Sequence, residues 1–262
     1  MASVHPTAVV DPLAKLADSV EIGSYTVIGP HVEIGAGTRV GPHCVIEGHT
    51  RIGQDNQIFQ FCSLGAAPQD KKYAGEPTQL LIGNRNTIRE FCTFNTGTVQ
   101  DKNFTRLGND NWVMAYVHIA HDCVIGDHNV IANAVQLAGH VEIGNRTLIG
   151  GLSGVHQFVR IGDFAMVGFS TRLSQDLPPF VMAAGNPAEA QNAHQEGPRR
   201  QGFSPARLAV LKQMYRIIYR KGLTLDGARA ELDALRGQEP ESVADIDMML
   251  SFLAGAARGI VR

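Results

Sequence analysis

The 262-residue sequence predicts an all-β fold, a parallel β-helix built from hexapeptide repeats, followed by a small C-terminal α-helical domain. Three observations predict this fold. An aliphatic residue recurs at every sixth position over most of the chain, glycine is enriched to 28 residues, and the period changes beyond about residue 188. Aromatic residues make up only 6% of the chain, so its core must be mostly aliphatic.

The six-residue repeat runs in strict progression from Val4 to Leu64, from Ile82 to Phe94 and from Leu107 to Leu173. A period of six fits neither an α-helix nor one long strand, and it is typical of a coil made of three short strands. One aliphatic residue of each strand points inward, and we expect glycine at the corners to supply unusual backbone conformations. Hexapeptide coils are known to wind left-handed, so we expect a left-handed β-helix, against the usual crossover rule.

Two breaks in the phase of the repeat predict loops that leave the coil. Asp70 and Glu76 occupy positions where the repeat requires an apolar residue, so roughly residues 66–79 leave the coil. The spacing from Phe94 to Leu107 exceeds one period by seven residues, so roughly residues 97–104 form a second loop. Loops that leave a regular solenoid are favourable places for a functional site.

The end of the repeat divides the chain into two expected domains, a β-helix over residues 1–187 and a helical domain over 188–262. Ser204-Pro205 and Thr224 are typical helix starts, because each places a capping hydroxyl before the first turn. We expect three helices, over about residues 204–220, 224–236 and 241–256.

Composition excludes several classes of protein. The net charge of −2 favours neither nucleic acid nor an anionic membrane as a partner, and no stretch approaches the ~20 apolar residues of a membrane helix. The first residues lack the basic and apolar regions of a signal peptide. The four cysteines form no C-x-x-C pair and each lies two residues before a core position, so we expect free thiols and a cytoplasmic protein: Cys44, Cys62, Cys92 and Cys123.

Polar residues that lie eighteen positions apart predict the candidate site, because one coil is eighteen residues long. This spacing stacks three corners within ~10 Å along one edge, given ~4.8 Å per coil. The corners carry His121-Asp122, Gly139-His140 and His156-Gln157, and His118 lies just before the first of them.

These residue types favour acyl transfer. Histidine titrates near neutral pH and can take a proton from a hydroxyl, while a neighbouring aspartate fixes its tautomer. A glycine lets a substrate carbonyl approach a backbone N–H that can hold an oxyanion. No serine or cysteine lies in this column, so direct attack by a substrate hydroxyl is favoured over an acyl-enzyme.

Three other interpretations of the same residues remain open at this point. The corner histidines can be ordinary solvated polar surface. His118, His121 and His140 can supply three ligands to zinc, as in hydro-lyases of this fold, although Asp122 and Gly139 would then be unexplained, and we expect no metal. The chain can also be a non-catalytic hexapeptide subunit that serves assembly.

Several segments together resemble the acyl-carrier-protein-dependent UDP-N-acetylglucosamine O-acyltransferases, the enzymes that start lipid A synthesis in Gram-negative bacteria. The resemblance covers essentially the whole chain. Generic hexapeptide acetyltransferases share the repeat but lack these segments. They are Val4-His5-Pro6-Thr7-Ala8, Gln69 to Pro77, His118-Ile119-Ala120-His121-Asp122, Ala138-Gly139-His140, Val155-His156-Gln157-Phe158, and Glu196-Gly197 with the Arg199-Arg200 and Gly202-Phe203 that follow.

The resemblance implies transfer of an (R)-3-hydroxyacyl group from acyl carrier protein to the 3-hydroxyl of UDP-N-acetylglucosamine by a homotrimer with active sites between subunits. It implies no cofactor beyond the phosphopantetheine of the donor protein. His121 would be the general base, Asp122 its orienting carboxylate and the Gly139 amide the oxyanion donor. The implied substrate-binding residues are Gln69, Asp70, Lys72, His118, His140, His156, Gln157, Glu196 and Arg200.

The sequence departs from the family pattern at three places. Asn95-Thr96 replaces a His-Arg pair, and His194 stands where many members have asparagine, so no role carries over to these positions. Phe169 stands where long-chain members have the glycine that measures acyl length. Because a benzyl group would shorten an apolar groove, we expect a medium-length acyl chain.

A basic stripe on the expected helix over about 204–220 is a candidate dock for the acidic acyl carrier protein. Lys212, Arg216 and Arg220 are four residues apart and so share one face. A solvated helix face is the alternative interpretation of this stripe. For the activity as a whole, an N-acyltransferase acting on an amino sugar nucleotide is the alternative nearest to the implied reaction.

Overall fold

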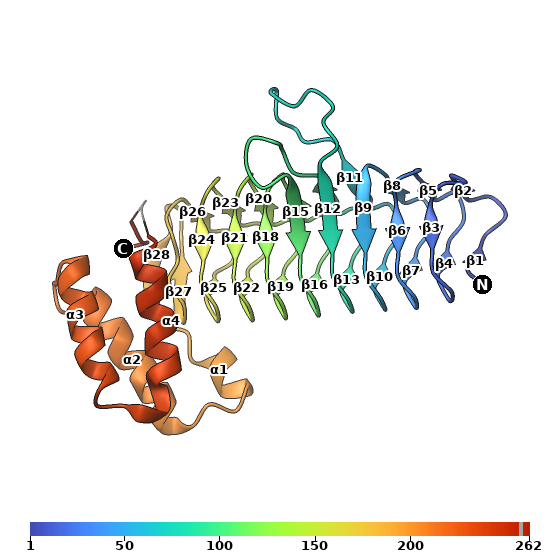
Figure 1. Cartoon of the computed structure of the whole chain (residues 1–262). Helices are drawn as coiled ribbons and strands as arrows, with labels where there is room; N and C mark the ends of the chain where they lie inside the picture. Colours follow the sequence, from blue (N-terminus) through green and yellow to red (C-terminus); the bar gives the residue numbers. More distant parts are fainter. Residues whose placement is uncertain (257–258) are drawn as a thin grey trace.

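The computed structural model of the chain describes residues 1–256 and 259–262. The chain winds into a three-sided prism of stacked short strands, with a group of helices at its C-terminal end (Figure 1). Every strand pair is parallel except the last, β27 with β28. The predicted β-helix with a helical C-terminal region is confirmed.

Each side of the prism is one sheet. The first sheet has eleven strands, in the order β1 (Ser3–Val4), β4 (Glu21–Ile22), β7 (Arg39–Val40), β10 (Gln57–Ile58), β13 (Thr87–Ile88), β16 (Trp112–Val113), β19 (Val130–Ile131), β22 (Leu148–Ile149), β25 (Met166–Val167), β27 (Val181–Ala184) and β28 (Glu189–Ala193).

The second and third sheets are shorter. The second has nine strands, β2 (Val9–Val10), β5 (Val27–Ile28), β8 (Val45–Ile46), β11 (Ser63–Ala66), β14 (Thr93–Asn95), β17 (His118–Ile119), β20 (Gln136–Leu137), β23 (Gly154–Val155) and β26 (Arg172–Leu173). The third has eight, β3 (Lys15–Leu16), β6 (Glu33–Ile34), β9 (His49–Ile52), β12 (Gln79–Ile82), β15 (Phe104–Leu107), β18 (Val124–Ile125), β21 (Glu142–Ile143) and β24 (Arg160–Ile161).

The repeated aliphatic residues fill the interior of the prism. From Ile22 to Leu173 each of them is buried, whereas Val4 is 42% exposed because it lies in the first coil, which has a neighbour on one side only. The four cysteines are buried and free, as expected. Packing of one aliphatic side chain on its equivalents in the next coils therefore forms one continuous core.

Glycine has a different role from the one we expected. Left-handed corner positions are held mostly by other residues, such as Tyr25 and His140. The glycines that follow core residues instead allow coils to approach each other. A Cβ on Gly23 would lie 2.7 Å from the carbonyl carbon of Gly41, and one on Gly126 would lie 2.7 Å from the Gly144 oxygen. Glycine is required at these positions because the backbone of the next coil leaves no room for a Cβ atom, and not because of a positive φ angle.

A ladder of buried asparagines ties successive coils together along the edge between the third and first sheets. The side-chain oxygen of Asn56 accepts from the Asn86 N–H (2.9 Å), that of Asn86 from the Asn111 N–H (2.9 Å), and that of Asn111 from the Asn129 N–H (2.9 Å). The Thr147 N–H in turn donates to Asn129. The ladder therefore satisfies buried amides that the strands leave unpaired.

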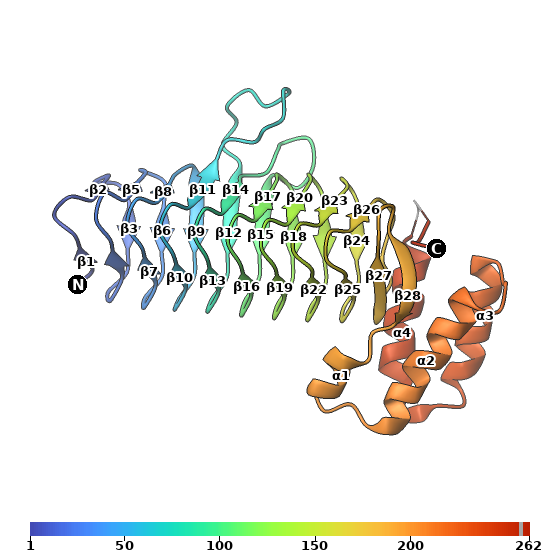
Figure 2. The same ribbon diagram turned by 180° about the vertical axis from the view of Figure 1, so that it is seen from behind.

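The helical region contains α1 (Glu196–Arg200), α2 (Pro205–Tyr219), α3 (Leu225–Arg236), a short 3₁₀ helix (Pro240–Ser242) and α4 (Val243–Ala254). Seen from behind, the helices lie at the opposite end of the prism from the N-terminus (Figure 2). Ser204 and Thr224 cap α2 and α3 as predicted, whereas α1 and β28 were not expected. None of the helices in the described ranges is long and apolar enough to cross a membrane.

We expect Asn111→Ala to lower the free energy of unfolding by about 1–3 kcal/mol, because it leaves the buried Asn129 N–H without its acceptor. Urea denaturation at fixed protein concentration measures this difference. Asn133→Ala, at an exposed position of a neighbouring coil, is the matched control and should change little. Equal losses in the two variants would contradict a stabilising role for the ladder.

Candidate active site

One edge of the prism carries both loops and all three candidate corners. At this edge the chain passes from the second sheet to the third, and we call it the site edge. Residues 67–78 leave it between β11 and β12, and residues 96–103 leave it between β14 and β15 (Figure 1). The corners after β17, β20 and β23 follow on the same edge. The sequence predicted the loops to within about a residue but did not place them beside the histidines.

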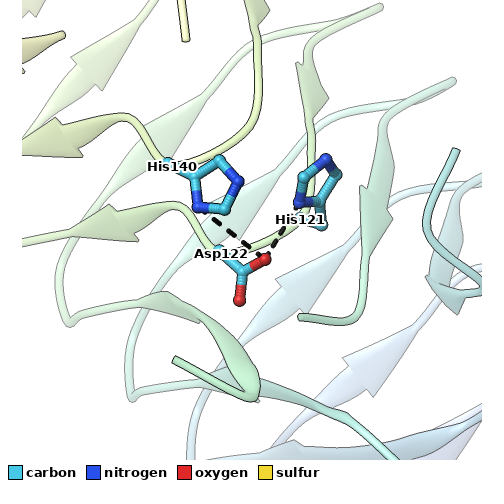
Figure 3. Close-up of side chains that lie close together, drawn as sticks. All are labelled: His121, Asp122 and His140. Carbon is cyan, nitrogen blue, oxygen red and sulfur yellow. Dashed lines mark hydrogen bonds and ion pairs between the residues drawn. The ribbon is translucent and has the colours of Figure 1, made fainter. Parts of the chain in front are cut away.

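His121 and Asp122 form a hydrogen-bonded pair at the first corner (Figure 3). Nδ1 of His121 lies 2.9 Å from Oδ2 of Asp122, whose side chain is completely buried. A carboxylate only accepts hydrogen bonds, so Nδ1 is the donor. Nε2 then carries the lone pair that a general base needs.

Asp122 is held in its ionised form by the second loop. Burial raises the pKa of this carboxyl, but hydrogen bonds from His121 and Thr98 outweigh burial and hold its pKa below the ordinary value. The Thr98 hydroxyl donates to Oδ2 (2.6 Å), and the Thr98 N–H donates to Oδ1 (3.0 Å). The sequence analysis missed Thr98, because its contact depends on the path of an irregular loop.

Gly139 lies directly above His121. A Cβ on Gly139 would be 2.6 Å from Cε1 of His121, so any side chain there would displace the imidazole. Among the residues that the structure describes, none accepts a hydrogen bond from the Gly139 N–H. This corner therefore places an amide donor without a backbone acceptor beside His121, which is the donor type that an oxyanion site uses.

The other histidines of the column lie where the eighteen-residue spacing predicts. His140 meets the His121 ring edge-on, with 4.9 Å between ring centroids, and its Nδ1 lies 3.9 Å from Oδ2 of Asp122. His118 precedes the pair on β17 and contacts the Thr93 hydroxyl through Nδ1 (2.8 Å). Burial lowers the pKa of His118, so it is neutral at pH 7. His156 and Gln157 are exposed at the third corner.

The loop of residues 67–78 carries the three residues that the family resemblance assigns to the sugar nucleotide. Asp70 accepts a hydrogen bond from the Lys72 N–H (3.0 Å), which shapes the turn. Gln69 and Lys72 are exposed. The loop and the His121 corner share the site edge, and no backbone hydrogen bond joins them within the described part of the chain.

Glu196 and Arg200 lie elsewhere. Both are on α1, pair with each other (2.9 Å), and line a cavity of about 540 Å³ over the first sheet with Trp112 and Met166. In a three-sided prism the first sheet is opposite the edge between the second and third. One chain therefore does not bring Glu196 and Arg200 to His121.

His194 lines the same cavity and is nearly buried. Its Nδ1 contacts the Phe164 carbonyl (2.7 Å) and its Nε2 accepts from the Gly197 N–H (3.3 Å). His194 therefore has a structural role in shaping the start of α1. Asn95 and Thr96 are likewise buried at the base of the second loop.

The chain is similar to known acyltransferases over its whole length. Residues 176–261 match the model described as "Udp N-acetylglucosamine O-acyltransferase; Domain 2", and residues 104–139 match the bacterial transferase hexapeptide model. The acyl-carrier-protein–UDP-N-acetylglucosamine O-acyltransferases of Verminephrobacter eiseniae and Thiobacillus denitrificans are 58% and 59% identical over 262 residues, covering 100% of each chain. The chain belongs to this O-acyltransferase family.

A solved UDP-N-acetylglucosamine O-acyltransferase from Moraxella catarrhalis superimposes with a TM-score of 0.95 at 48% identity, covering 99% of each chain. The UDP-N-acetylglucosamine acyltransferase from Francisella novicida superimposes with a TM-score of 0.95 at 36% identity, covering 99% of this chain and 94% of that one. The resemblance inferred from the sequence segments is therefore confirmed. The likeness in fold covers nearly the whole chain, the helical region included.

Two further sets of residues predicted from the sequence lie away from the site edge. Phe169 is 69% exposed on the edge between the first and second sheets, and it packs over Gly151, as the stacking predicts. Lys212 and Arg216 are exposed on α2, and Arg220 is exposed at its C-terminal cap, where it also contacts the Tyr215 ring. Neighbouring Arg199 and Arg200 are both paired with Glu196.

The three side chains in Figure 3 have ligand atoms within 4.8 Å of one another, close enough to consider a metal. Their hydrogen bonds favour another arrangement. Asp122 accepts from His121 and Thr98 with both oxygens, and Nδ1 of His140 contacts a second carboxylate, Asp101 (2.6 Å). His118, the third zinc ligand considered from the sequence, lies outside this group.

We expect Thr98→Val to shift acid unfolding to higher pH. The folded pKa of Asp122 is lowered, so its ionised form stabilises the fold above the ordinary carboxyl value, and this contribution is lost as pH falls through the folded pKa. Removing the hydroxyl brings that pKa back toward its ordinary value. It should also lower the free energy of unfolding at pH 7 by about 1.5–3 kcal/mol.

Circular dichroism during acid titration measures the shift. Thr98→Ser keeps the hydroxyl and is the matched control, which should titrate like wild type. If the valine variant unfolds at the wild-type pH, Thr98 does not determine the ionisation of Asp122.

Proposed function

We propose that this chain transfers a 3-hydroxyacyl group from acyl carrier protein to the 3-hydroxyl of UDP-N-acetylglucosamine, the first step of lipid A biosynthesis. The observation that carries the proposal is the hydrogen bond of His121 to the buried Asp122, beside the Gly139 amide, in a member of this O-acyltransferase family. The four free thiols suit a cytoplasmic enzyme.

The proposed mechanism is direct transfer. Nε2 of His121 takes the proton of the sugar hydroxyl as its oxygen attacks the thioester carbonyl, while Asp122 stabilises the imidazolium. The Gly139 N–H binds the tetrahedral oxyanion. The intermediate then expels the phosphopantetheine thiolate, which receives the proton from His121. An acyl-enzyme is disfavoured, because burial raises the pKa of the neighbouring Cys123 to about 12 and keeps its thiol protonated.

The proposal includes a homotrimer with active sites between subunits. Its support is geometric, since Glu196 and Arg200 lie over the first sheet and His121 lies on the opposite edge. A neighbouring copy that packs its helical region toward the site edge would bring the two sets together. Glu196 and Arg200 would then contact the nucleotide, as the family resemblance implies.

Within the site, the acceptor would contact the histidine column and the first loop. His118, His140, His156 and Gln157 would line the sugar pocket, and Gln69, Asp70 and Lys72 would reach the sugar nucleotide from the loop. The acidic carrier protein would dock on the exposed stripe formed by Lys212 and Arg216 of α2 and by Arg220 at its C-terminal cap, because opposite charges steer such encounters.

His121→Ala should lower kcat by at least about 100-fold, because it removes the general base. The assay uses 3-hydroxyacyl carrier protein and UDP-N-acetylglucosamine, with His5→Ala as a control at an exposed histidine of the first coil. Full activity of the His121 variant would refute the assigned site. A wild-type enzyme that acylates only an amino sugar nucleotide, or that contains zinc and dehydrates its substrate, would instead support one of the two alternatives.

Phe169→Gly should shift the preferred donor to longer acyl chains, because it removes an exposed benzyl group from the position to which the family resemblance assigns the measurement of acyl length. Turnover of 3-hydroxyacyl donors of increasing length measures the shift. Leu152→Gly, at another exposed apolar position of the same edge, is the control. A wild-type preference for the longest donor would refute a medium-length limit at Phe169.

A further inference from the structure

We propose that Asp101 is a positioning residue for this reaction, which fixes the tautomer of His140 and ties the second loop to the site. The inference rests on the proposed function and adds to it a residue that neither the repeat nor the family resemblance identifies. Asp101 is separated from His140 by 39 positions in the sequence, and it reaches His140 only because residues 96–103 fold back over the site edge.

The contact defines the tautomer of His140. Its Nδ1 lies 2.6 Å from Oδ2 of Asp101, and a carboxylate can only accept. Nδ1 is therefore protonated, and in the neutral ring Nε2 is left as a hydrogen-bond acceptor. Phe158 stacks on one face of the ring at 4.3 Å and 7°, and His121 meets its edge. The ring is held by three neighbours.

A neighbouring cation keeps Asp101 ionised. Nζ of Lys102 lies 3.1 Å from Asp101 and 3.3 Å from Glu142 on β21. Burial raises the pKa of Asp101, but hydrogen bonds from His140 and Lys102 outweigh burial and lower it overall. Burial lowers the pKa of Lys102, but the carboxylates of Asp101 and Glu142 outweigh burial and raise this pKa above its ordinary value. A stable carboxylate therefore faces His140 at neutral pH.

The second loop thus contacts two successive corners of the site. Thr98 binds Asp122 on the first corner, and Asp101 binds His140 on the next. His121 and His140 are therefore each paired with one carboxylate, His121 with Asp122 of the corner and His140 with Asp101 of the loop. Any displacement of the loop would alter both, so the loop sets the orientation of the base and of His140 together.

The chemical consequence concerns a substrate hydroxyl. With Nδ1–H committed to Asp101, Nε2 of His140 can accept a hydrogen bond from a hydroxyl of a carbohydrate acceptor. Without Asp101 the ring can populate the other tautomer, which presents an N–H donor to that hydroxyl instead. Binding of the acceptor in the transition state should weaken, while the acyl donor should be affected much less.

A double-mutant cycle with Asp101→Ala and His140→Gln tests the coupling in the full-length enzyme. Asp101→Ala should lower kcat/KM for UDP-N-acetylglucosamine about tenfold to hundredfold, as expected for loss of a hydrogen bond to a charged group. Asp101→Asn, which keeps an acceptor, should lose less. The KM for the acyl donor should stay within about twofold.

In the His140→Gln background the loss caused by Asp101→Ala should nearly vanish. Asp233→Ala removes a carboxylate from an exposed ion pair with Arg236 on α3 and is the matched control, with unchanged kinetics. Equal losses in both backgrounds would overturn the proposal, because Asp101 would then act through the loop and not through His140. Wild-type kinetics of Asp101→Ala would overturn it as well.

A measurement without substrate separates this inference from the proposed function. Nitrogen-15 NMR of histidine-labelled enzyme, with the His140 signals assigned from His140→Gln, reports which ring nitrogen carries the proton. We expect Nδ1 protonation in the wild type and loss of that preference in Asp101→Ala. A wild-type ring protonated only at Nε2 would overturn the inference, even in an active enzyme. Inactivity toward UDP-N-acetylglucosamine would refute the proposed function and leave the tautomer result standing.

Discussion

Vertical stacking of coil on coil is the physical constraint on which the rest of this structure depends. Backbone hydrogen bonds between equivalent strands fix a register of eighteen residues, and aliphatic side chains can fill the interior only if that register is kept. The close approach of neighbouring backbones removes side chains from positions such as Gly23 and Gly126. The buried asparagine ladder then satisfies the amides at one edge.

The same constraint builds the chemistry. Because corner residues eighteen apart lie above one another, a short polar segment repeated with variations becomes a column of His121, Gly139 and Gln157 on one rigid edge. The prism fixes the backbone of each member, and the second loop supplies the polar partners that hold the side chains, Thr98 for Asp122 and Asp101 for His140. The geometry of the candidate site therefore comes from two sources, a regular scaffold and one irregular segment attached to it.

The sequence predicts those features that follow from its period. The fold, the two loops, the stacking of His121 under Gly139 and three of the helices were all predicted, because each follows from spacing or from capping residues. The contacts of Thr98 and Asp101 could not be predicted, since an irregular loop has no period that relates its residues to the coil. The role of the glycines was predicted wrongly. The sequence of one repeat does not show how closely the backbone of the next coil approaches it. The position of Glu196 opposite the site edge could not be predicted either, because it depends on which side of the prism the helical region packs against.

The two ends of the prism differ, and this difference affects where the molecule opens. The last coils are covered by β28 and the helices, whereas the first coil has a free face with Val4 and Val9 exposed. In a stack where each coil contacts only its neighbours, thermal opening proceeds coil by coil from the least covered end. Amide hydrogen exchange should therefore form a gradient along the axis, fastest near β1 and slowest beyond the site. Fraying at the N-terminal end would leave the column of His121, Gly139 and Gln157 intact, several coils away.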